Sequence, residues 1–176
     1  MISKQQTLLL CIYSAIFISL VIYVTLPTEY REITTEKNFV KIVNIEKKQL
    51  FDLMADVSNY PSVLRENFLD VEIIEQNSNV LVAKETIYEN GITATLTVKH
   101  IVTPYENHVL EILDGDAKGT KITIIFEDVD YGTKVSIKSE MHLTGLLIPF
   151  AYLPDSNLNH ATNTVIDSFV NYIKNN

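Results

Sequence analysis

The sequence lacks tryptophan altogether and contains one cysteine, five glycines and five prolines among its 176 residues. Because Cys11 is the only thiol, no intrachain disulfide is possible and the redox compartment stays undetermined. No P-loop, G-x-S-x-G or N-x-Ser/Thr pattern occurs, and no cluster of His, Cys, Asp and Glu has the spacing of a metal site. We therefore expect no metal and no organic cofactor, and we assign no catalytic residue.

Positive charge is also scarce, with 14 Lys and Arg against 22 Asp and Glu. Lys4 is the only charged residue before residue 28, so the rest of the chain carries 13 basic and 22 acidic residues, a net charge of −9. No basic cluster interrupts this acidity. Nucleic-acid binding would lack its main electrostatic contribution, and tight adhesion to anionic lipid headgroups is disfavoured for the same reason.

Residues 8–26 contain no charge at all, and they form the longest apolar run of the sequence. A helix over this run would be about 28 Å long, enough to cross the hydrocarbon core of a bilayer. A cleaved secretory signal is the alternative, but its apolar part would be shorter, and no A-x-A-like cleavage site follows. We predict a single-pass anchor in residues 1–27. Lys4 and the α-amino group favour a cytoplasmic N-terminal tail and an extracytoplasmic domain.

Beyond the anchor, residues 28–37 are predicted as a polar juxtamembrane spacer and residues 38–176 as one domain. Apolar and polar residues alternate over 39–45, which predicts a strand, and two short helices follow around a break at 56–61. A period of two then predicts six further strands, over 68–74, 80–88, 92–102, 108–113, 120–129 and 133–143. The chain closes with a predicted helix over 156–176, whose apolar stripe is Leu158, Ala161, Val165, Phe169 and Ile173.

Two motifs in this order resemble a known family. Phe51-Asp52-Leu53, Asp56-Val57 and Tyr60-Pro61 are similar to the paired short helices of the START-like, helix-grip superfamily, and "DYGTKVSIKSEMHL" (130–143) is similar to its last strand. Within it, the chain resembles the coenzyme Q-binding and polyketide cyclase/dehydrase-like branch. The resemblance implies an α+β fold with a curved antiparallel sheet of about seven strands, two short helices after the first strand and a long C-terminal helix.

The resemblance also implies an apolar cavity between the sheet and the C-terminal helix. Strand and helix periodicity selects the side chains that could line it: Leu96, Val98, His100, Ile124, Phe126, Ile137, Met141, Leu147, Phe150, Tyr152, Val165 and Phe169. A close-packed core without a cavity is the alternative for each of these residues.

Polar residues with the parity of the apolar face are the sharper candidates. His100 shares the parity of Leu96 and Val98, but it lies near a strand end, so we expect a solvated side chain. Glu85 fits either face, and a buried carboxylate would be costly without a partner. We place His108 in a turn, and Glu140 and His142 on the outer face.

The apolar stretch at 143–154 is too short to span a membrane, so we interpret it as a cover for the core or as a membrane-facing entrance. Together these features predict a membrane-anchored protein that binds a lipophilic small molecule, a lipid or an isoprenoid quinone. Two alternatives stay open: a cyclase/dehydratase-type enzyme using His100, Glu85 or a tyrosine, and an interaction module for another membrane protein.

Overall fold

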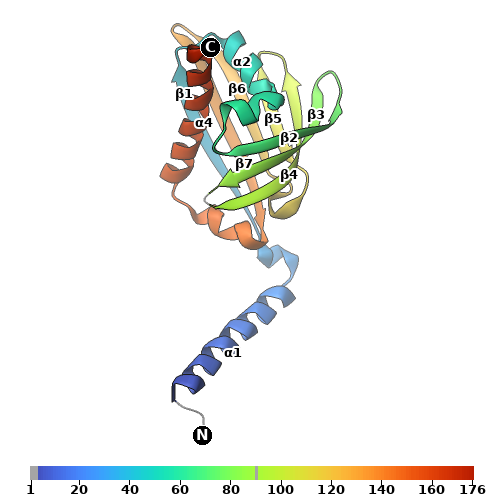
Figure 1. The fold of residues 1–176 in the computed structure, drawn as a ribbon, viewed down its shortest axis with the longest axis vertical. Helices are drawn as coiled ribbons and strands as arrows, with labels where there is room; N and C mark the ends of the chain where they lie inside the picture. The colour runs from blue at the N-terminus through green and yellow to red at the C-terminus, as the bar shows by residue number, and fades with distance from the viewer. Residues whose placement is uncertain (1–3, 90) are drawn as a thin grey trace.

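One curved sheet of seven antiparallel strands organises the structure, a computed structural model that describes residues 4–89 and 91–176 (Figure 1). The spatial order β1-β7-β6-β5-β4-β3-β2 makes all neighbours except β1 and β7 consecutive along the chain. The bounds are β1 (Glu32–Val43), β2 (Phe68–Gln76), β3 (Val80–Glu89), β4 (Ile92–Thr103), β5 (Asn107–Ile112), β6 (Lys121–Val129) and β7 (Gly132–Thr144). The predicted helix-grip fold is confirmed.

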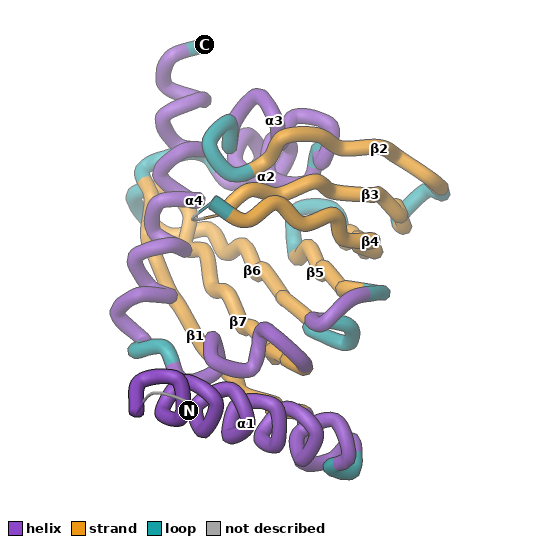
Figure 2. The backbone as a smooth tube through the Cα atoms, turned by 60° about the horizontal axis from the view of Figure 1, so that its bottom comes forward, coloured by secondary structure: helices purple, strands orange, loops and turns teal. Residues whose placement is uncertain are grey.

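Helices cover the concave side of this sheet at one end and along one edge. The α-helices are α1 (Lys4–Thr25), α2 (Lys47–Ala55), α3 (Tyr60–Val63) and α4 (Asp155–Asn175), and the 3-10 helices are η1 (Thr28–Arg31), η2 (Val57–Asn59), η3 (Gly115–Ala117) and η4 (Gly145–Tyr152). Figure 2 shows α2 and α3 over one end of the sheet, and α4 running beside β1. The first turns of α4 follow η4 at the opposite end, close to α1 (Figure 1).

The first strand begins earlier than the sequence predicts. Residues 32–37 pair with β7, from Glu32 opposite Thr144 to Lys37 opposite Ser139, so most of the predicted spacer belongs to the sheet. The cause is the length of β7, because a partner strand that runs to Thr144 offers ladder hydrogen bonds to any extended segment beside it. Only η1 and two residues then separate α1 from the sheet.

The break between the two short helices has a local cause. The Asp56 carboxylate accepts hydrogen bonds from the Ser58 backbone N–H at 3.2 Å and from Asn59 Nδ2 at 2.7 Å, which satisfies donors at a helix start. Pro61 lies in the first turn of α3, where its missing N–H costs nothing. The buried Tyr60 hydroxyl donates to the Met54 carbonyl oxygen at 2.9 Å. These contacts fix α2 and α3 against one end of the sheet.

Aromatic packing fills the core at that end. The Phe51 ring lies 5.1 Å from Phe126, and the Tyr60 ring lies 5.9 Å from Phe169 on α4, both in edge-to-face geometry. Val135 and Ile166 are fully buried among them. This end of the domain therefore has the close packing of an ordinary protein interior.

Helix α1 stands apart from this core. Its 22 residues have a mean hydropathy of 2.4 over the most apolar window, none of that window is buried, and it is the one helix in residues 4–89 and 91–176 long and apolar enough to cross a membrane. An isolated helix with apolar side chains on every face is unstable in water, because each of its faces exposes hydrocarbon to the solvent. The composition of α1 is therefore suited to a lipid environment.

Candidate functional site

The concave face of the sheet is the surface that the helices partly cover. Strand register shows which side chains share it: His100 on β4 lies opposite Leu81 on β3 and Leu110 on β5, and Ile137 on β7 lies opposite Ile124 on β6. Because every second residue of a strand points to the same side, the apolar positions of β3 to β7 form one continuous surface. The parity predicted for β4, β6 and β7 agrees with this arrangement.

Burial differs from place to place along this surface. We call the part beneath α2, α3 and the second half of α4 the packed end; its apolar side chains are buried, including Ile124, Phe126, Val135, Ile166 and Phe169. We call the part near η3, η4 and the start of α4 the open end; several of its apolar side chains are half-buried, namely Leu96, Ile122, Ile137, Met141 and Val165, although Leu143 at the end of β7 is buried. Leu96 lies against Gly115 of η3, which places the open end at the side of the domain nearest α1 (Figure 1).

The twelve residues predicted to line a cavity fall into three groups. Five are buried: His100, Ile124, Phe126 and Phe169 at the packed end, and Val98 outside the main core cluster. Five are half-buried: Leu96, Ile137, Met141, Leu147 and Val165. The remaining two, Phe150 and Tyr152, lie on η4 and are 47% and 75% exposed. Only the half-buried group and η4 are therefore in a position to meet a ligand without displacing the packed core.

A chain of three ionisable side chains crosses the packed end, and two of them were assigned wrongly from the sequence. His100 is fully buried, not solvated, because the covering helix α3 reaches the end of β4 where it lies. His108 is fully buried on β5, not in a turn. The alternation of His108 with Leu110 and Ile112 was the signal for an inward position.

The three side chains come from adjacent strands and lie in line. Oε1 of Glu85 on β3 is 2.9 Å from Nε2 of His100, and Nδ1 of His100 is 3.0 Å from Nε2 of His108. Glu85 is only 4% exposed. The Glu85–His100 contact has the distance of an ion pair without the alignment of a hydrogen bond, so both atoms keep unused hydrogen-bonding capacity.

Burial sets the protonation of His108 and of the nearby Tyr60. Removal from water, and then the neighbouring His100, lower the pKa of His108 to about 3, against a backbone contact to Met54 that favours the charged form. Removal from water, and then the charges of Glu85 and Asp56, raise the pKa of Tyr60 far above its usual range. Near neutral pH the His108 ring is therefore uncharged and Tyr60 keeps its proton.

The Glu85–His100 pair has the chemistry of an acid–base couple. A carboxylate and an imidazole in contact exchange a proton readily, and exclusion of water strengthens the electrostatic effect of each on a bound polar group. Burying an ionised group costs on the order of several kcal/mol. Apolar side chains would therefore fill this space with a smaller loss of stability. The pair is thus a candidate functional element as well as a part of the core.

The outer-face pair expected from the sequence does not form a ligand set. Glu140 contacts Lys138, and His142 contacts Glu32 with Nε2 at 3.5 Å from Oε2. Within residues 4–89 and 91–176, no group of three or more His, Cys, Asp or Glu side chains is arranged to hold a metal ion.

Comparisons with known proteins agree with this geometry. The ribosome association toxin RatA of Vibrio cholerae is 25% identical over 134 residues, which cover 76% of this chain and 91% of RatA. Among solved structures, Ara h 8.0201 superposes with a TM-score of 0.65 at 18% identity, covering 82% of this chain and all of that one. Norcoclaurine synthase of Thalictrum flavum, solved with dopamine and hydroxybenzaldehyde, gives a TM-score of 0.59 at 11% identity over 81% of this chain and 90% of the synthase.

These structural likenesses show the fold, and a sequence model shows the family. The model described as "Polyketide cyclase / dehydrase and lipid transport" matches residues 43–170, which run from the end of β1 to the buried turns of α4. The match includes both motifs, the Glu85–His100–His108 group and strands β2 to β7. The chain belongs to the polyketide cyclase/dehydrase and lipid transport family.

Proposed function

We propose that this protein is a single-pass membrane protein that binds a lipophilic small molecule against the concave face of its sheet. The observation that carries the proposal is the apolar area left partly exposed at the open end, where Leu96, Ile137 and Met141 are half-buried. Apolar area left in contact with water is unfavourable by about 25 cal/mol per Å², so an apolar ligand would stabilise the open end.

The surroundings of the open end favour entry from a bilayer. Phe150 and Tyr152 on η4, together with Leu153, are exposed beside it, and Tyr30 of η1 is 73% exposed next to α1. Aromatic side chains with one polar end are favoured at the level of lipid headgroups. With α1 in the membrane, η4 would lie close to the source of a hydrophobic ligand, which raises its effective concentration. The domain is proposed to lie on the extracytoplasmic side.

A second candidate function is acid–base catalysis on such a molecule, and the Glu85–His100 contact of 2.9 Å favours it. Norcoclaurine synthase and the aromatase/cyclases are enzymes that share this fold, which makes a reaction in the same place structurally feasible. A substrate would have to displace the covering helix α3, whose Tyr60 ring lies 6.4 Å from the His100 ring, to reach the pair. Ligand binding is therefore the first proposal and catalysis the second.

The ribosome association named for the Vibrio cholerae relative is not part of the proposal. The chain beyond Lys4 has a net charge of −9, and contact with ribosomal RNA would be opposed by that charge.

The test is extraction of the bound molecule. The full chain is purified in detergent, and lipids released from it are compared by mass spectrometry with those from Ile137→Trp, which fills the open end. Ile125→Trp is the matched control, because Ile125 lies on the convex side of β6 and is 41% exposed. We expect a discrete apolar molecule in the native chain and in the control, and its loss in Ile137→Trp. Equal lipid content in all three proteins would overturn the proposal.

A further inference from the structure

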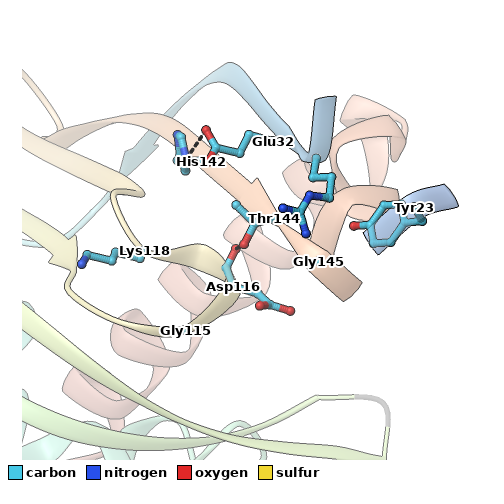
Figure 3. A pocket seen from close by; sticks show the side chains of 9 residues that line it. Tyr23, Glu32, Gly115, Asp116, Lys118, His142, Thr144 and Gly145 are labelled. Atoms are coloured by element: carbon cyan, nitrogen blue, oxygen red, sulfur yellow. Dashed lines mark hydrogen bonds and ion pairs between the residues drawn. The ribbon is translucent and has the colours of Figure 1, made fainter. Parts of the chain in front are cut away.

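An open pocket of about 450 Å³ lies outside the concave face, where the ends of β1 and β7 meet η3 and η4 (Figure 3). Its walls carry charges of both signs: Arg31 and Lys118 are basic, Glu32 and Asp116 are acidic, and His142 lies beside Glu32. Tyr23 of α1 closes one side, and Figure 3 shows it across the pocket from Lys118. Neither the apolar ligand nor the Glu85–His100 pair uses this pocket.

The pocket lies next to the proposed membrane surface. Arg31 follows Thr25, the last residue of α1, by six positions. Six residues span at most about 20 Å even when fully extended, so Arg31 stays close to the headgroup layer if α1 crosses the bilayer. The inference below rests on that part of the proposed function.

Arg31 is the residue of the pocket that most needs a partner. Its Nε is buried and makes no hydrogen bond, and the guanidinium forms no ion pair with any residue in the described part of the chain. A guanidinium has five donors in a planar fork that matches the oxygens of a phosphate, and leaving a buried donor unpaired is costly. The pocket therefore presents a site for an oxyanion.

The acidic residues restrict which oxyanion would fit. Glu32 contacts His142 at 3.5 Å, and the Asp116 carboxylate lies within 3.0 Å of where a side chain at Gly145 would begin, close to the backbone of η4. A purely anionic group would be repelled by these two carboxylates. A group that carries an ammonium near its phosphate would be attracted by all four charges.

We infer that this pocket binds the phosphoethanolamine headgroup of a membrane phospholipid, with the phosphate on Arg31 and the primary ammonium on Glu32 and Asp116. The quaternary ammonium of phosphocholine has no N–H to donate to a carboxylate, and phosphoglycerol has no cation. A site of this kind also agrees with the net charge of −9, because it needs no attraction to an anionic surface. One bound lipid would fix the tilt of the domain on the membrane.

The test compares lipids with identical acyl chains and different headgroups. The full chain in detergent is titrated with phosphatidylethanolamine, phosphatidylcholine or phosphatidylglycerol, and bound lipid is measured by native mass spectrometry. We expect phosphatidylethanolamine to bind about tenfold more tightly than the other two, the size of one charge-assisted hydrogen bond. Equal binding of the three lipids would overturn the inference. Soluble glycerophosphoethanolamine binding as tightly as the lipid would assign the pocket to a free metabolite instead.

Two arginines make a matched pair of variants. Arg31→Gln should lose about tenfold in affinity for phosphatidylethanolamine, whereas Arg65→Gln, on the other side of the domain, should lose nothing. Arg31→Lys keeps the charge without the fork and should fall between them. An Arg31→Gln variant that has the melting temperature of the native protein and yet binds like Arg65→Gln would refute the assignment. The apolar molecule lost in Ile137→Trp should persist in Arg31→Gln, so the two proposals fail separately.

Discussion

The two ends of the concave face are made by the same strands and yet have opposite characters. At the packed end, Phe51, Tyr60 and Phe169 interlock over β4, β5 and β6, and even a carboxylate and two imidazoles are enclosed. At the open end, Ile137 and Met141 stay half-buried. The difference lies in what covers each end, because α2 and α3 join the second half of α4 at the packed end, whereas α4 begins at the open end.

This contrast separates stability from binding. Side chains at the packed end contribute most of the folding free energy, and those at the open end remain available for a ligand. Two ion pairs, Lys37 with Asp155 and Lys41 with Asp167, connect β1 to the first and second halves of α4. The helix is thus attached along its β1 side at both ends of the face, and ligand access is expected on the side of β4 and β5.

Truncation of a side chain at each end gives the largest expected difference. Phe169→Ala should lower the free energy of unfolding by about 3–5 kcal/mol, because a fully buried ring leaves a cavity. Met141→Ala should lower it by about 1 kcal/mol, since a half-buried side chain has less area to lose. Chemical denaturation of the full chain in detergent measures both. Similar losses for the two variants would show that the ends do not differ in packing.

Substitutions in the Glu85–His100 pair test whether these two buried polar side chains stabilise each other. Replacement of either residue alone by Leu should destabilise the protein by about 3 kcal/mol, because the partner is left buried without its counterpart. The double replacement should cost less than the sum of the single ones, with a coupling of about 1–3 kcal/mol. A double-mutant cycle from denaturation curves measures the coupling. Strict additivity would mean that the 2.9 Å contact contributes nothing.

The pH dependence of stability gives the most specific effect. An ordinary histidine titrates near pH 6.5, whereas burial and the neighbouring His100 lower the pKa of His108 to about 3 in the folded protein. Between about pH 6.5 and pH 3 the unfolded chain therefore binds a proton that the folded protein does not. This site alone should reduce the free energy of unfolding by up to about 1.4 kcal/mol per pH unit as the pH falls through that window.

Denaturation midpoints of the full chain between pH 7 and pH 4 measure that slope. His108→Leu should flatten it, and His160→Gln, at an exposed position of α4, should leave it unchanged. A slope that persists in His108→Leu would assign the acid sensitivity to other groups.

Much of this architecture was predictable because it depends on short-range patterns. The alternation in the strands and the Asp56–Pro61 break are set by neighbours along the chain, whereas the hairpin turn expected at Asn90-Gly91 includes a residue outside the described ones. The start of β1 was not predictable, because residues 32–37 are extended only through their pairing with β7. The lining residues were selected by parity, which distinguishes the two faces of a strand and says nothing about depth.

The sequence by itself determined that one segment is suited to a bilayer, that the rest resembles a helix-grip domain, and which side of β4, β6 and β7 faces inward. Only the tertiary structure decided that His100 and His108 are enclosed, that Glu85 meets them, and that the apolar face is half-open near α1. The physical reason is that periodicity is a property of the local backbone, whereas depth depends on which distant helices pack over a position. For this protein, those helices are α2, α3 and the second half of α4.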